Sequence, residues 1–319
     1  MARRLNRTTE RHHVQQAARR QVRARLVPAH LVLCAIGTDT GGSVRIPASY
    51  NVVVGYKTST GRIDKTGLVP LARTYETIGP LARSVEDCIL LDVLMRGKVA
   101  LPVRRAELNS LTVVAPTNVV LDDIELSGAH ELRAVAGDAR IAGVTVRRER
   151  VEALDRVIDM TARFGTLVAA EAYTEYRDIA DSEKANELDR RVLLRMMGGR
   201  KMSAADVLSI QRGRQALIPT LTGQLDGALL AMPTTVLTAP KVAPLDADHE
   251  LFHKINMRTL RNTTMGNVLD LCAVALPNSR DGKGLPTSIL FSAPHNHDEQ
   301  LLGYALAIGS VIREFFKAS

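Results

Sequence analysis

A short run of small residues between Gly37 and Pro47, GTDTGGSVRIP, carries the clearest sign of chemistry in this sequence. Ser43 supplies a hydroxyl that becomes a nucleophile when a base takes its proton. Gly41 and Gly42 can adopt positive φ at no steric cost, so the chain can turn tightly and point N–H groups into one concavity. Such a concavity stabilises a developing oxyanion. From the residue types alone, a plain glycine turn between two buried segments is an equal alternative.

Two better-known glycine motifs do not fit this run. The spacing lacks the G-x-x-x-x-G-K-[ST] order of a phosphate-binding loop. It also lacks the G-x-S-x-G order of a nucleophile elbow. The run therefore is neither a phosphate-binding loop nor a nucleophile elbow.

Three further motifs follow in sequence order. They are VGYKTSTGR at residues 54–62, GLVPLA at residues 67–72 and TIGPLARSVED at residues 77–87. Together with residues 37–47 they resemble the amidase signature family in order and in spacing. Several short motifs in the right order are far more specific than any one of them, so the chain is identified as a member of that family.

This resemblance implies a reaction and assigns roles. It makes Ser43 the catalytic nucleophile for hydrolysis of a carboxamide C–N bond in a small-molecule substrate. It makes four backbone N–H groups the oxyanion hole, those of Thr40, Gly41, Gly42 and Ser43. Asp39 and Arg45 flank the nucleophile, and we expect them to support the loop rather than to react. In the family an unprotonated lysine acts through a serine in a cis peptide, so no Ser-His-Asp arrangement is required.

Residues 1–30 differ from the rest of the chain. The family carries a Gly/Ser-rich segment with the second serine shortly before the nucleophile, and its catalytic lysine further upstream. No serine precedes Ser43 in this sequence, and residues 1–30 form a basic leader instead. We therefore expect residues 31–319 to form an amidase domain that lacks its N-terminal portion, a truncated copy with little or no activity.

Three interpretations of this leader stay open. A frameshift would explain it, because the codons for residues 16–21 read in another frame encode Ser, Gly and other mostly small residues. The others are an authentic divergent start and a solvated basic arm, and basic arms often contact nucleic acid. Much of the net charge of +8 comes from the first 25 residues, so we do not expect the folded domain to bind nucleic acid.

Two other functions stand as alternatives to an amidase. The first is the glutaminase (A) subunit of a tRNA-dependent amidotransferase, but residues 260–277 lack the Tyr- and Gly-rich closing pattern of that subunit. The second is a catalytically inactive binding protein that uses the basic arm. Lys57 or Lys65 would have to be buried to replace the missing base at neutral pH, and we expect neither to do so.

The overall composition limits the class of protein. Of the 319 residues, 45% are apolar and 24% are charged, which is ordinary for a globular protein. No apolar run reaches membrane-spanning length, and no secretory segment follows the basic residues. Cys34, Cys88 and Cys272 have no pairing pattern, which favours the reducing cytoplasm. We expect no cofactor, no metal at His295 and His297, no membrane, and a homodimer as the only further partner.

Apolar patterning predicts an α/β fold. Residues 51–56, 111–116 and 144–146 are typical of strands, and residues 126–142 are typical of an amphipathic helix between the last two. Residues 225–235, 267–277 and 284–290 resemble the family's later strands. Together these features imply a mixed, twisted β-sheet with helices on both faces.

The predicted helices are marked mainly by their caps. Ser84 begins a helix that continues through Met95, and Ser203 with Asp206 caps another within a long charged helical region at residues 181–215. The remaining helical predictions are residues 151–176, residues 256–264 and a terminal helix at residues 300–316 preceded by Asp298 and Glu299. Residues 239–248 are predicted to form a loop.

Overall fold

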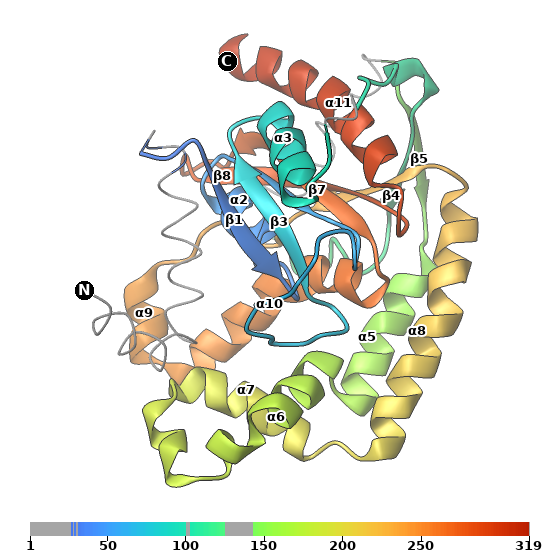
Figure 1. Cartoon of the computed structure of the whole chain (residues 1–319). Coiled ribbons are helices and arrows are strands. Elements are labelled where there is room, and N and C mark those ends of the chain that lie inside the picture. The colour runs from blue at the N-terminus through green and yellow to red at the C-terminus, as the bar shows by residue number, and fades with distance from the viewer. Residues whose placement is uncertain (1–26, 28, 30, 100–102, 125–142, 319) are drawn as a thin grey trace.

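A single β-sheet organises the computed structural model of the chain, which describes residues 27, 29, 31–99, 103–124 and 143–318 (Figure 1). The predicted helix at 126–142 and nearly all of the predicted leader lie outside the described residues. The sheet has eight strands in the order β1-β3-β2-β7-β8-β6-β4-β5. They are β1 (Cys34–Asp39), β2 (Val54–Lys57), β3 (Thr77–Ala82), β4 (Thr112–Pro116), β5 (Thr145–Glu149), β6 (Leu229–Pro233), β7 (Cys272–Arg280) and β8 (Pro286–Ala293).

Strand directions make the sheet mixed. Neighbours are antiparallel from β1 across to β6, whereas β6, β4 and β5 run parallel. Parallel neighbours need a crossover connection rather than a tight turn, and the connection from β5 to β6 is built mainly of helices. The predicted mixed sheet with helices on both faces is confirmed.

Side-chain alternation along the central strands explains why both faces are covered. On β7, Cys272 and Val274 belong to one hydrophobic core, and Ala273 and Ala275 belong to the other. All four are fully buried. A strand buried on both sides must be apolar throughout, which is the pattern that the sequence shows here.

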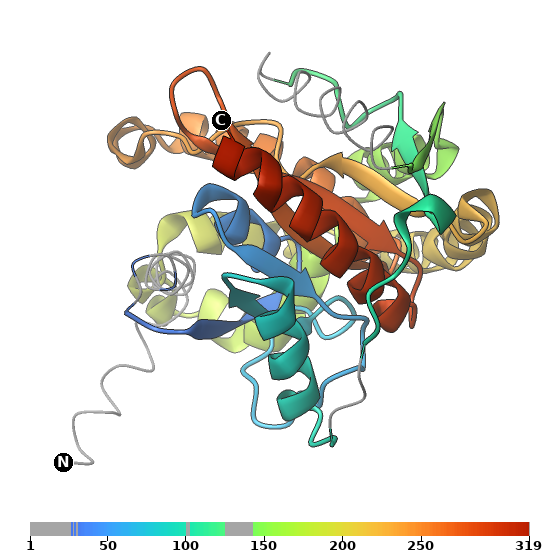
Figure 2. The same cartoon turned by 90° about the horizontal axis from the view of Figure 1, so that it is seen from above.

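Helices form a layer on each face of the sheet. One layer holds α3 (Val85–Met95) and α11 (Asp298–Ala318), which lie side by side (Figure 2). The other holds α2 (Arg45–Tyr50), α5 (Glu152–Phe164), α8 (Ala204–Leu225) and α10 (His249–Val268). A helical pair, α6 (Leu167–Ala180) and α7 (Arg190–Arg200), packs together below the sheet (Figure 1).

The predicted caps are confirmed at two helices. Ser84 accepts the Asp87 N–H at the start of α3, and Ser203 forms a reciprocal capping box with Asp206 at the start of α8. Each cap satisfies backbone N–H groups that a helix leaves without an internal partner.

Two predicted helical stretches are wrong in length. Residues 151–176 divide into α5 and α6 because Gly165 has a φ of +84° and Thr166 caps a new helix. Residues 181–215 divide into a 3-10 turn (Glu183–Glu187), α7 and the first part of α8. The predicted loop at 239–248 contains a short helix, α9 (Val242–Ala247), and a second 3-10 turn (Leu108–Ser110) precedes β4. The continuous apolar period suggested a single helix in each stretch. In the structure, local capping side chains end one helix and begin the next.

Candidate active site

The loop that carries Ser43 lies at one end of the sheet, between β1 and α2 (Figure 1). Thr40 and Gly42 are buried, whereas Gly41 and Ser43 are partly exposed. On its inner side the loop packs against α10, where the hydroxyl of Thr263 donates to the carbonyl of Gly41 at 2.7 Å. The nucleophile candidate therefore stands at the surface of a loop that is fixed from beneath.

A buried carboxylate, Asp39, holds this loop from within. Its Oδ1 accepts the N–H of Gly42 at 2.8 Å, and its Oδ2 accepts the N–H of Val44 at 3.2 Å. Arg45 donates to it from Nε at 3.0 Å and from Nη2 at 2.9 Å, and neither side chain is exposed. Burial alone would raise the pKa of the Asp39 carboxyl, but Arg45, these hydrogen bonds and Lys57 hold that pKa well below its usual range. Asp39 therefore stays charged and serves as an anchor.

Helix α10 adds two contacts that the sequence analysis missed. Asn267 accepts from Arg45 Nη2 at 2.6 Å and donates to Asp39 Oδ1 at 3.1 Å. Thr263 accepts Arg45 Nη1 on its backbone carbonyl at 2.8 Å, while its hydroxyl holds Gly41. A spacing of four places both residues on one helix face, which is the only sign of their role in the sequence.

Backbone N–H groups of the loop point in two directions. The N–H of Gly42 donates to Asp39, so we no longer count Gly42 among the four predicted oxyanion donors. The carbonyl of Gly42 accepts the N–H of Ile46 at 2.8 Å, and the N–H of Ser43 points the opposite way because the peptide between them is planar and trans. Across the described residues, no acceptor lies against the N–H of Gly41 or Ser43. These two groups are free to bind a ligand.

No base stands beside Ser43 in the described part of the chain, where its hydroxyl makes no hydrogen bond. Lys57 is 1% exposed, and its Nζ donates to two backbone carbonyls at 3.1 and 2.8 Å. Burial, and then the neighbouring Arg45 charge, lower the pKa of Lys57 to about 8. Lys65 donates to another backbone carbonyl at 3.0 Å. Both lysines are thus engaged away from the nucleophile.

Comparison with known proteins assigns the chain to a family. The family model described as Amidase matches residues 23–302. The chain belongs to the amidase family. The match begins inside the segment 1–30 that the sequence analysis set apart as a leader.

This member of the family has relatives of established name. It is 32% identical over 286 residues to 2-amino-5-chloromuconic acid deaminase of Comamonas testosteroni, covering 88% of this chain and 61% of the deaminase. It is 27% identical to mandelamide hydrolase of Pseudomonas putida, covering 90% of this chain and 60% of the hydrolase. A crystal structure of an amidase superposes with a TM-score of 0.78 at 24% identity, covering 92% of this chain and 65% of that one. The fold is therefore shared, and the chain spans about 60% of the length of the two named relatives.

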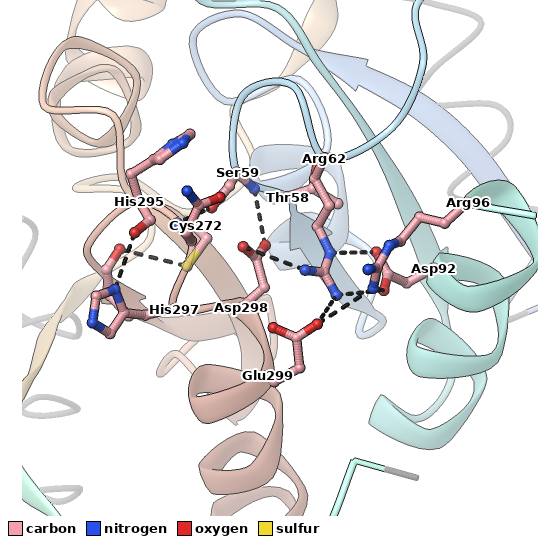
Figure 3. A network of polar contacts seen from close by, with 12 residues as sticks. Thr58, Ser59, Arg62, Asp92, Arg96, Cys272, His295, His297, Asp298 and Glu299 are labelled. Carbon is pink, nitrogen blue, oxygen red and sulfur yellow. Dashed lines mark hydrogen bonds and ion pairs between the residues drawn. The ribbon is translucent and has the colours of Figure 1, made fainter. Parts of the chain in front are cut away.

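A second polar cluster connects α11 to the loop after β2 (Figure 3). Arg62 pairs with Asp92 of α3 at 2.7 Å and with Glu299 of α11 at 2.8 Å. Asp298 is fully buried, and its Oδ1 accepts the N–H of Ser59 at 2.9 Å. The predicted terminal helix begins two residues earlier than expected, so both acidic residues stand in the first turn of α11 rather than before it, and they also connect that helix to the loop.

The two histidines near this cluster bind protein groups. Nδ1 of His295 lies 3.3 Å from Oδ2 of Asp270, and Nδ1 of His297 lies 3.0 Å from the backbone carbonyl of His295. Within the described residues, no cluster of three His, Cys, Asp or Glu side chains has a metal-binding arrangement. In that same part of the chain, no helix combines the length and apolar character needed to cross a bilayer.

Gly42→Ala is expected to lower the free energy of unfolding by about 1–3 kcal/mol. Gly42 has a φ of +131°, and an added Cβ would stand 2.3 Å from Thr263 Oγ1 and 2.7 Å from Ile46 Cδ1. Urea unfolding measures the change. Gly61→Ala is the matched control because Gly61 has a φ of +80° with open space around it. If the two variants lose the same stability, the clash with α10 and α2 is not the cause.

Lys57 is expected to make stability rise with pH in alkaline solution. Its folded pKa of about 8 lies below the ordinary 10.5, so the unfolded chain binds more protons between these values. The contribution of Lys57 to the free energy of unfolding is therefore lowest below about pH 8 and rises by about 3 kcal/mol toward pH 10.5. Urea unfolding across this pH range gives the free energy of unfolding of wild type and of Lys57→Met. The difference between the two isolates Lys57, because the other titrating groups are the same in both proteins. Parallel pH profiles would contradict the prediction.

Proposed function

We propose that this chain hydrolyses the C–N bond of a small carboxamide with Ser43 as the nucleophile. The observation that carries the proposal is the two-sided loop around Ser43. The N–H groups of Gly41 and Ser43 are free beside a partly exposed hydroxyl, while Asp39 holds the opposite side of the loop. This is the arrangement that acyl transfer needs, a nucleophile next to preorganised donors. Membership of the amidase family and the names of its relatives support the same reaction class.

The chemistry follows from these positions. Ser43 Oγ attacks the amide carbon while a base takes its proton, and the carbonyl oxygen becomes an oxyanion held by the N–H groups of Gly41 and Ser43. The C–N bond then breaks, and the leaving nitrogen takes a proton. Water attacks the acyl-serine and releases a carboxylic acid, so that one water is consumed for each amide. Thr40 is 2% exposed, which makes its N–H a poorer donor to substrate.

None of the described residues is placed to act as the base. Within them, Lys57 and Lys65 donate to backbone carbonyls, and Asp39 is saturated by Arg45 and backbone donors. A small amine in solution should therefore stand in for the base, because Ser43 is partly exposed.

We also propose a cellular compartment and an oligomeric state for the chain. We place the chain in the cytoplasm, since Cys34, Cys88 and Cys272 are all free thiols. We propose a homodimer, which sedimentation equilibrium would detect as twice the 34.7 kDa of one chain. A single 34.7 kDa species at micromolar concentration would contradict the dimer.

Ammonia release from a panel of aliphatic, aryl and arylacetic amides tests the reaction. Each amide is assayed with the full chain, with and without added ethylamine, and glutamine is included. We expect hydrolysis of at least one small amide, increased by ethylamine. Hydrolysis of glutamine alone would favour the glutaminase alternative. The proposal fails if no amide is hydrolysed in either condition and an activated p-nitrophenyl ester does not acylate Ser43, as read by peptide mass spectrometry.

A further inference from the structure

One peptide of the loop, between Gly41 and Gly42, is held at both ends. Its carbonyl oxygen accepts the hydroxyl of Thr263 at 2.7 Å, and its N–H donates to Asp39 at 2.8 Å. The two partners stand on α10 and on β1, far apart in the chain. Their contacts fix the plane of a peptide that has glycine on both sides.

Glycine on both sides makes this restraint necessary. Without a Cβ, the backbone of Gly41 and Gly42 can rotate at low cost, so the intervening peptide can flip. A flipped peptide would turn the Gly41 carbonyl toward the carboxylate of Asp39, which now accepts the Gly42 N–H. Carbonyl and carboxylate oxygens repel each other, so the loop would move away from Asp39, and the free N–H groups of Gly41 and Ser43 would lose their fixed positions. The hydroxyl of Thr263 opposes this flip by holding the carbonyl inward.

We propose that Thr263 is a positioning residue that keeps the N–H groups of Gly41 and Ser43 available for the oxyanion of the substrate. The predicted effect of Thr263 on the reaction rate rests on the proposed function. Its predicted effect on the conformation of the loop rests on geometry alone. Thr263 also accepts Arg45 through its backbone carbonyl at 2.8 Å, so one residue joins the peptide to the Asp39 anchor.

The neighbouring contacts define the controls. Thr264 also directs its hydroxyl at the Gly41 carbonyl, but at 3.4 Å, which is too long to restrain the peptide equally. Thr263 has a second acceptor in its own helix, the carbonyl of Leu260 at 3.1 Å. If Thr263 had a purely structural role in α10, its hydroxyl would act through that intrahelical bond, and removal of the hydroxyl would leave the loop unaffected.

Three variants of the full chain separate these roles. Thr263→Val keeps the shape and removes the hydroxyl, Thr263→Ser restores the hydroxyl, and Thr264→Val makes the same change at the adjacent position. For Thr263→Val we expect kcat for amide hydrolysis to fall by about 10–100-fold with KM within about twofold, a smaller loss than removal of a donor itself. Thr263→Ser and Thr264→Val should stay within about threefold of wild type.

Amide hydrogen exchange of peptides spanning residues 38–46 gives a second readout that needs no turnover. We expect Thr263→Val to speed exchange in this segment by about tenfold, since the Gly42 N–H loses its fixed plane, and Thr264→Val to leave it unchanged. Unchanged exchange in Thr263→Val overturns the inference whatever the activity. The inference is also overturned if Thr263→Val raises KM at constant kcat, or if Thr263→Val loses kcat and Thr263→Ser does not restore it. If the wild type neither hydrolyses amides nor is acylated, the proposed function fails, and faster exchange in Thr263→Val would still support the restraint.

Discussion

Ser43→Ala is expected to lower kcat for carboxamide hydrolysis by on the order of 10⁴–10⁶-fold, a loss of roughly 5–8 kcal/mol in transition-state stabilisation. The Ser43 hydroxyl is partly exposed whereas that of Thr40 is buried, and alanine at position 43 removes the nucleophile without disturbing the backbone donors. Substrate binding should change little, because the N–H groups of Gly41 and Ser43 stay in place. Ammonia release with the best amide of the panel, in the presence of ethylamine, measures the loss.

A matched control lies in α2, the helix that follows the loop. Ser49 is 1% exposed, and its hydroxyl has no hydrogen-bond partner in the described structure. Ser49→Ala makes the same chemical change in the helix that follows the loop, so we expect kcat within about twofold of wild type. An active Ser43→Ala enzyme would show that the reaction uses another nucleophile.

Arg45→Met is expected to lower the free energy of unfolding at pH 7 by about 3–5 kcal/mol. The substitution leaves Asp39 charged in a site with no solvent access, and it removes donors to Thr263 and Asn267. Breaking a buried pair costs more than the pair contributes, because the remaining charge is desolvated without compensation. Urea unfolding at pH 7 measures the change, and Arg45→Lys should recover only part of it, since lysine lacks the planar fork.

An exposed ion pair gives the comparison for this second prediction. Arg73 pairs with Glu175 at 3.0 Å, with side chains 71% and 32% exposed. Arg73→Met is expected to cost less than about 1 kcal/mol. If Arg45→Met costs no more than Arg73→Met, the buried pair does not anchor the loop.

The sequence by itself identified the family, and it predicted the loop and its candidate nucleophile. Those signals are local: a run of small residues around Ser43, an acidic and a basic residue at fixed spacing, and short motifs in order. The caps at Ser84 and Ser203 were predicted for the same reason, because a capping side chain and the N–H that it accepts are three residues apart. Local signals of this kind need no knowledge of the fold.

Helix lengths were harder to predict because two local preferences competed. Residues 151–176 keep an apolar period that favours one helix, yet Gly165 and Thr166 end α5 and begin α6. The positive φ of Gly165 and the cap at Thr166 therefore outweigh the apolar period.

Only the tertiary structure decided which backbone N–H groups face a substrate. Asn267 reaches Arg45 across 222 positions, and Thr263 reaches Gly41 across the same separation. The sequence assigned four N–H groups to the oxyanion hole, but the folded chain uses that of Gly42 to hold the Asp39 carboxylate. A buried carboxylate needs several donors, and it takes those that the fold brings within reach. Residue types and spacing can therefore name a nucleophile, but the direction of each peptide around it is set by distant partners.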